Sequence, residues 1–182
     1  MNIILQGAAA EMEQKGADFT MDSLAKRLHI SKRTIYEKYE SKNQIINLIF
    51  ELKMDDLRIQ HDEILSNDNL SFQEKLSQYF AVQSRVYPTI PSDKIRAIQD
   101  KVPQVLVNIN AKIEAEWIRL EAFLRKGQED GNIGAEVDIH ILMLMLRGIY
   151  SEMINNPQYS VLEIGNSLQK AMMMLIGGIA VK

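Results

Sequence analysis

The chain has 182 residues, of which 46% are hydrophobic and 25% charged, so it can bury a core and does not have the composition of a disordered chain. It contains no cysteine, which excludes disulfides, thiolate metal sites and thiol catalysis and fits a reducing cytoplasm. The sequence shows no signal peptide and no run of about 18 uncharged apolar residues, so we expect a cytoplasmic protein without a membrane partner.

The net charge of −3 argues by itself against a nucleic-acid partner, but the charges are unevenly distributed. Residues 1–50 carry seven Lys and Arg and six Asp and Glu, so this segment is slightly positive. The rest of the chain carries 14 basic and 18 acidic side chains and is negative. The distribution weakly favours a nucleic-acid partner at the N-terminal end.

The first predicted helix covers residues 2–15 and ends at Gly16, a residue that often terminates helices. Its apolar stripe consists of Ile3, Ile4, Ala8, Ala9 and Met12. Two shorter helices follow, and the hydroxyls of Thr20 and Ser31 are suited to cap them by accepting backbone N–H groups. The second of these is expected from Lys32 to about Lys38.

This second short helix has two chemically different faces. Ile35 and Tyr39 face the preceding helix, whereas Lys32, Arg33 and Tyr36 face outward. An apolar back with a basic, aromatic front is typical of a helix that reads the major groove of DNA. The alternative is a surface hairpin whose charged face is merely solvated.

Residues 31–42, Ser-Lys-Arg-Thr-Ile-Tyr-Glu-Lys-Tyr-Glu-Ser-Lys, resemble the signature of the tetracycline-repressor (TetR) family of transcription regulators. The resemblance is specific over residues 3–50 and only architectural beyond them. It implies backbone contacts from Thr20, Ser31, Thr34, Lys38 and Lys42, a phosphate or thymine-methyl contact from Tyr36, and base contacts from Lys32 and Arg33. The chain departs from the family pattern at Arg33, where Gly is common, and at Glu37, where a basic residue is frequent.

The remainder of the chain is also helical in pattern. Three capping boxes, Ser41–Gln44, Ser71–Glu74 and Ser160–Glu163, open helices, and Pro88 and Pro91 end one. We expect helices from Ser41 to about Leu65, Ser71 to about Tyr87, about Ser92 to Lys101, Pro103 to Gln128, Val137 to Ile154, and from Ser160 onward.

No segment alternates with the period of a strand, so the predicted fold is all-α with about nine helices. We expect an N-terminal three-helix DNA-binding domain with a helix-turn-helix at residues 1–48. Residues 49–182 are expected to form a C-terminal helical bundle for ligand binding and dimerisation.

The last two helices are densely apolar, and the resemblance implies that they pair with a second copy in a four-helix bundle. A larger core within one chain is the alternative. The expected interface residues are Leu142, Leu146, Ile149, Met153, Leu168, Met172, Leu175 and Ile176. A homodimer of this kind would place two recognition helices in successive major grooves, which predicts a palindromic operator.

Aromatic residues of the C-terminal part are candidates for an apolar effector pocket, although ordinary core packing is the alternative for each. These candidates are Phe72, Tyr79, Phe80, Tyr87, Trp117 and Phe123. His29, His61 and His140 lack the spacing of metal ligands, and we expect no metal, cofactor or catalytic residue.

The sequence therefore predicts a DNA-binding repressor, not an enzyme, that a small and largely apolar ligand releases from its operator. A family member controlled by a protein partner is the first alternative, and a small all-α carrier or enzyme is the second. A gel shift with the chain's own upstream DNA would separate the two regulators from the carrier or enzyme.

Overall fold

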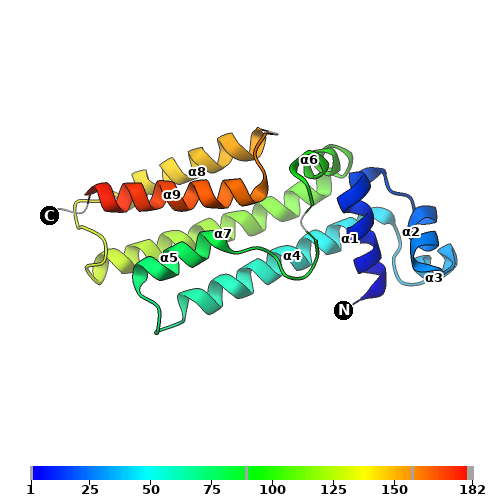
Figure 1. Ribbon diagram of the computed structural model, residues 1–182, viewed down its shortest axis with the longest axis horizontal. Coiled ribbons are helices and arrows are strands. Elements are labelled where there is room, and N and C mark those ends of the chain that lie inside the picture. Colours follow the sequence, from blue (N-terminus) through cyan, green and yellow to red (C-terminus); the bar gives the residue numbers. More distant parts are fainter. Residues whose placement is uncertain (1, 89, 157, 180–182) are drawn as a thin grey trace. The chain divides into compact units, whose positions relative to one another are not determined.

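The computed structural model describes residues 2–88, 90–156 and 158–179, and within these ranges all regular structure is helical, as predicted (Figure 1). Contacts divide the chain into two compact units. The N-terminal unit comprises Met1–Leu57 and Ser84–Lys112, and the C-terminal unit comprises Arg58–Gln83 and Ile113–Lys182. Of the helices in the described ranges, none is long and apolar enough to cross a membrane.

The N-terminal unit begins with α1, whose two ends are both capped. The Asn2 side chain accepts the backbone N–H of Ile4 at 3.0 Å, and Gly16 ends the helix at a φ of 59°, which confirms its predicted role. The unit holds α1 (Ile3–Lys15), the short 3-10 helix η1 (Gly16–Asp18), α2 (Met21–Leu28), α3 (Lys32–Tyr36), the first part of α4 (Lys42–Leu65), α6 (Ser92–Lys101) and the first part of α7 (Pro103–Glu129).

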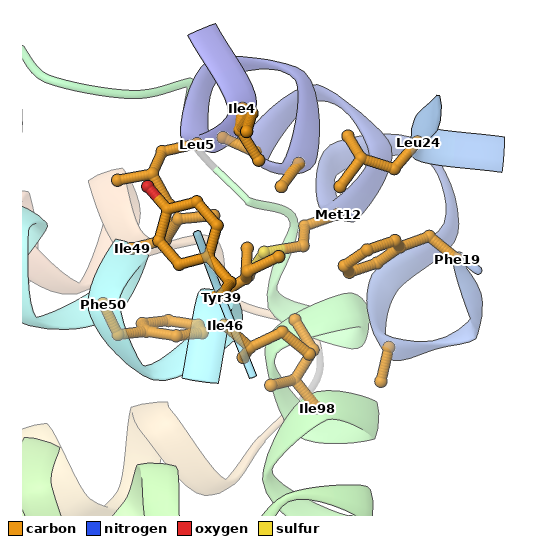
Figure 2. Close-up of a cluster of buried hydrophobic side chains, with 14 of the residues drawn as sticks. Ile4, Leu5, Met12, Phe19, Leu24, Tyr39, Ile46, Ile49, Phe50 and Ile98 are labelled. Atoms are coloured by element: carbon orange, nitrogen blue, oxygen red, sulfur yellow. The ribbon is translucent and has the colours of Figure 1, made fainter. Parts of the chain in front are cut away.

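The core of the N-terminal unit combines two separate stretches of sequence. Figure 2 shows side chains of α1, α2 and α4 packed around Met12, with Ile98 of α6 among them. The second stretch contributes Tyr87, Ile90, Ile98, Val102 and Val105, all buried. This compact unit therefore extends past the boundary expected at residue 48.

Two local details differ from the sequence-based expectation. Helix α3 ends at Tyr36, two residues early, although the backbone N–H of Tyr39 still bonds to the carbonyl of Ile35. At the start of α4, Ser41 accepts the backbone N–H of Gln44 as expected. The Gln44 side chain accepts the N–H of Glu40 at 2.7 Å, one residue before the expected partner.

The C-terminal unit is built from long helices around one apolar core. It holds the end of α4, α5 (Phe72–Ala81), the rest of α7, α8 (Ile139–Asn155) and α9 (Val161–Ile179), and α8 and α9 lie side by side (Figure 1). The predicted capping boxes of α5 and α9 are confirmed, because Glu74 and Glu163 accept the backbone N–H groups of Ser71 and Ser160. Asp138 caps α8, so this helix starts two residues later than expected.

The expected extension of α5 to about Tyr87 is wrong, because the helix ends at Ala81. The residues that follow bond to side chains of α4 instead of continuing the helix. The Asp56 carboxylate accepts the backbone N–H of Arg85 at 2.6 Å, and the Lys53 ammonium donates to the carbonyl of Tyr87 at 3.1 Å. Contacts between residues so far apart in sequence leave no local signal.

Helices α5 and α9 approach closely at Gly165. A Cβ atom at this position would lie 2.6 Å from the backbone carbonyl oxygen of Phe80, closer than real Cβ contacts. A glycine is therefore required where these two backbones meet.

Candidate nucleic-acid interface

Helices α2 and α3 form the predicted helix-turn-helix, and their caps define its shape. Thr20 caps α2, with a reciprocal bond between the Ser23 hydroxyl and the Thr20 N–H, and Ser31 caps α3 by accepting the N–H of Thr34 at 3.0 Å. His29 ends α2 in the left-handed region at a φ of 53°. The motif therefore consists of two well-capped helices that meet at a sharp turn.

The two faces of α3 are separated as the sequence predicts. Ile35 is fully buried and Tyr39 nearly so, whereas the Arg33 side chain is 89% exposed and Tyr36 is 51% exposed. Half of the surface of this aromatic residue therefore remains open to solvent. The front of α3 is therefore available to a partner.

Both cations at the start of α3 are paired with carboxylates. The Lys32 ammonium lies 2.9 Å from Asp22 of α2, and the hydrogen bond from Lys32 to Asp22 raises the pKa of Lys32. The Arg33 guanidinium lies 3.1 Å from Glu37, one helical turn further on. All four side chains are more than half exposed, so these pairs exchange readily with water.

The Lys42 side chain is held in place more firmly than the other side chains that are predicted to contact DNA. Its ammonium donates to the backbone carbonyls of Ala17 at 2.7 Å and Phe19 at 3.2 Å, and it lies 5.4 Å from the centre of the Phe19 ring. These contacts fix the positive charge at the N-terminus of α4, where the helix end also attracts anions. Of the remaining predicted DNA contacts, Thr20, Ser31 and Lys38 are exposed and Thr34 is half-buried.

A buried carboxylate that the sequence analysis missed joins α1 to α2. Glu11 is 2% exposed and accepts bonds from Lys15, Ser23 and Arg27 at 2.6 to 2.7 Å. Burial alone would raise the pKa of Glu11, but these three bonds lower it to about 2. Because Ser23 also completes the cap at Thr20, this network fixes the N-terminal end of α2.

The candidate pocket residues do not all lie in one unit. Tyr87 packs in the core of the N-terminal unit, not in the C-terminal unit where the pocket is expected. The other candidates lie in the C-terminal unit. There the rings of Phe72 and Phe123 stack with their centres 4.9 Å apart, and Tyr79 contacts Phe80 edge to face. Trp117, buried in the same core, contacts Tyr150 edge to face at 5.6 Å. A surface hollow of about 600 Å³ on this unit is lined instead by Ile59, Asp62, Glu63, Leu65 and Ser66.

A polar cluster next to these aromatic side chains also escaped the sequence analysis. The Nδ1 atom of His61 lies 2.7 Å from the Glu116 carboxylate, and its Nε2 atom lies 3.2 Å from the Tyr79 carbonyl oxygen. The His61 ring stacks on the Tyr79 ring at 3.8 Å. His61 is therefore a packing residue that joins α4, α5 and α7.

The expected dimer residues lie on the core side of α8 and α9. Most of them are buried in the core of their own unit: Leu142, Leu146, Met153, Leu168 and Met172. Ile149 and Leu175 are partly buried against the same core, and the side chain of Ile176 lies outside the described residues. Among the side chains of these helices that the structure describes, the large exposed apolar ones are Ile141, Leu144, Met145, Met173 and Met174.

Comparison with known proteins also indicates a helix-turn-helix at the N-terminal end. Residues 4–49 match the model of the tetR family of bacterial regulatory proteins. The chain is 24% identical over 174 residues to the uncharacterized HTH-type transcriptional regulator YvaF of Bacillus subtilis (strain 168), covering 92% of this chain and 89% of the relative.

Two solved structures have the same fold. PfmR, a TetR family regulator from Thermus thermophilus, is 21% identical with a TM-score of 0.68, over 99% of this chain and 100% of that one. FadR from Bacillus subtilis, solved with stearoyl-CoA, is 21% identical with a TM-score of 0.62, over 97% of this chain and 98% of that one. The helix-turn-helix of residues 4–49 is therefore of the tetR family type, and the chain as a whole has the fold of TetR family regulators.

Proposed function

We propose that this regulator is a repressor that binds a palindromic operator as a homodimer and is released by a small, largely apolar ligand. The observation that carries the DNA-binding part is the exposed front of α3, with Tyr36 and two cations on a helix whose opposite face is fully buried. In this proposal residues 1–48 read DNA, and residues 49–182 bind the ligand and dimerise. Tyr36, Lys32 and Arg33 reach into the major groove, while Thr20, Ser31, Thr34, Lys38 and Lys42 contact the backbone.

DNA binding is tested with an operator selected from a random duplex library, followed by affinity measurements on that operator. Tyr36→Ala removes an exposed side chain, so it should leave folding intact and weaken operator binding by about tenfold or more. Ile118→Ala, at an exposed site on α7, is the matched control and should change nothing. Equal affinities of the Tyr36→Ala variant and the unaltered protein would contradict the assignment of α3.

The second copy is proposed to cover the exposed apolar side chains of α8 and α9. Leu144 is 52% exposed and Met174 is 73% exposed, and such residues rarely gather on the surface of a monomer. Leu144→Glu should produce monomers in sedimentation experiments and weaken operator binding by about 100-fold or more, because the two half-sites are no longer linked. Ile59→Glu, at an exposed site on α4, should stay dimeric. A dimeric Leu144→Glu variant would place the interface elsewhere.

The ligand is proposed to bind among the aromatic side chains of the C-terminal unit. The complex of FadR with stearoyl-CoA and the ketosteroid regulator KstR2 of Mycobacterium tuberculosis, which has the same fold, support an apolar effector. Trp117 is the single tryptophan and lies in this core, so its fluorescence reports on ligand entry. Titration with stearoyl-CoA should change this fluorescence and release operator DNA. Fluorescence and operator affinity that stay constant with acyl-CoA and steroid ligands would favour control by a protein partner.

A further inference from the structure

The basic front of α3 is almost neutral in the free protein, and this has consequences for how the regulator selects DNA. Lys32 and Arg33 are each paired with a carboxylate, Asp22 and Glu37 respectively, at 2.9 and 3.1 Å. Affinity for DNA of arbitrary sequence comes mainly from cations that neutralise phosphates. A cation that already has a carboxylate partner gains less from a phosphate, so this part of the affinity is reduced.

The two pairs are weak enough to open when DNA offers better partners. All four side chains are more than half exposed, and ion pairs of this kind contribute roughly 0 to 1 kcal/mol. Opening a pair, however, leaves its carboxylate next to the DNA. Beside a phosphate that carboxylate is repelled, whereas at a base edge it can accept a bond from the amino group of cytosine or adenine.

We propose that Asp22 and Glu37 are specificity-determining residues of this regulator. They suppress binding to DNA of arbitrary sequence and favour sites where Lys32 or Arg33 reaches guanine N7 and O6 while the released carboxylate accepts a base amino group. Glu37 lies one turn beyond Arg33 on the exposed face, so the two groups can address neighbouring base pairs. The inference rests on the proposed DNA-binding function.

Glu40 provides a matched control in the same region. It is exposed, lies three residues after Glu37, and forms no ion pair with any residue that the structure describes. Glu40→Gln therefore removes the same charge as Glu37→Gln without freeing a cation of α3. Any difference between the two variants isolates the effect of the ion pair from that of net charge.

The test compares Asp22→Asn, Glu37→Gln and Glu40→Gln by fluorescence anisotropy on the selected operator and on a mixed-sequence duplex of equal length, over a range of salt concentrations. Each freed cation neutralises one more phosphate, so the first two variants should steepen the salt slope for mixed DNA by about 0.9. This change in slope corresponds to about fivefold tighter binding of mixed-sequence DNA at about 0.15 M salt. Operator affinity should stay constant or fall, which lowers the ratio of operator to mixed-sequence affinity about fivefold or more.

The inference is overturned if Glu37→Gln and Glu40→Gln raise both affinities by the same factor, since only net charge would then matter. It is also overturned if the affinity of the first two variants for mixed DNA does not change. Failure of the proposed function gives a different result, in which the unaltered protein selects no operator at all. The substitutions keep the shape of exposed side chains, and circular dichroism confirms that the variants are folded.

Discussion

Each unit of the molecule keeps a carboxylate inside, and the two do so with different partners. In the N-terminal unit, Glu11 is bound by Lys15, Arg27 and Ser23 at 2.6 to 2.7 Å. In the C-terminal unit, Glu116 is bound by His61 at 2.7 Å and by the Tyr79 hydroxyl at 3.4 Å, with Arg119 at 3.9 Å. The N-terminal network relies on short bonds from permanent cations, and the C-terminal network relies on an aromatic stack with longer contacts.

The difference matches what each unit has to do in the proposed function. Glu11 fixes α2 against α1 and so holds the end of α2 at Thr20, where a phosphate is expected. The cluster around His61 joins α4, α5 and α7 through bonds that are mostly longer, which suits a region that must rearrange when a ligand enters. We therefore expect the Glu11 network to stay intact under conditions in which the contacts around His61 already open.

The largest effect is expected from Glu11→Gln, which keeps the shape of the side chain and removes its charge. A fall in pKa from 4.5 to about 2 corresponds to about 3 kcal/mol, so the variant should lose about that much free energy of unfolding at neutral pH. The measurement is urea denaturation, in which hydrogen exchange of the backbone amides in α1 and α2 monitors unfolding. Glu13→Gln, an exposed site on the same helix, should cost less than about 0.5 kcal/mol.

The same residue gives a pH dependence with a definite sign. Because the folded pKa of Glu11 lies below the unfolded value, its contribution is complete above about pH 4.5 and is lost as pH falls towards 2. The Glu11→Gln variant lacks this part of the acid unfolding profile. Identical profiles for the variant and the unaltered protein would show that Glu11 does not carry this stability.

A smaller effect is expected from His61→Phe in the C-terminal unit. Phenylalanine can keep the stack on Tyr79 but removes both nitrogen contacts, so Glu116 loses its short bond. We expect a loss of about 2 kcal/mol in urea denaturation followed by Trp117 fluorescence. Adding Glu116→Gln should recover part of the loss, because the side chain that lost its short bond is then uncharged. Strictly additive losses would show that the two side chains are not coupled.

The sequence predicted most helix boundaries because capping residues act locally. Thr20, Ser31, Ser71 and Ser160 each accept the expected backbone N–H in the structure. Glu11 could have been found as well, since it lies on the same face of α1 as the apolar residues Ile4 and Ala8. A lone acid in an apolar stripe indicates a buried ion pair.

Other features depend on contacts that no local pattern records. A helix that is apolar on nearly all sides does not indicate which face meets its own core, so the pattern assigns Leu146 to the dimer and does not single out Leu144. The place of Tyr87 in the N-terminal core follows from the return of the chain to that unit after α5. Periodicity alone could not assign either residue.

The close approach at Gly165 offers the next test, with a glycine of the N-terminal unit for comparison. Gly165→Ala forces a Cβ atom against the Phe80 backbone, which cannot yield without moving a helix, and should cost about 1 to 2 kcal/mol. Gly7→Ala meets only side-chain atoms of Leu28 and Leu24, which can shift more easily than a backbone, and it gains helix propensity, so it should cost less than Gly165→Ala. The free energies of unfolding of both variants are measured by thermal denaturation. Equal losses of stability would show that the contact with the Phe80 backbone does not restrict position 165 to glycine.

The smallest effect is expected from Tyr79→Phe, because its hydroxyl makes only long bonds of 3.3 and 3.4 Å to Glu116. We expect a loss of about 0.5 to 1 kcal/mol by Trp117 fluorescence at neutral pH. Burial and the nearby Glu116 charge raise the pKa of Tyr79 above its ordinary value of 10.0, so the unfolded chain ionises first as pH increases. The unaltered protein therefore loses stability relative to the variant above about pH 10, and the difference between them narrows. A difference that stays constant through that range would mean that the Tyr79 hydroxyl is not shielded from water in the folded protein.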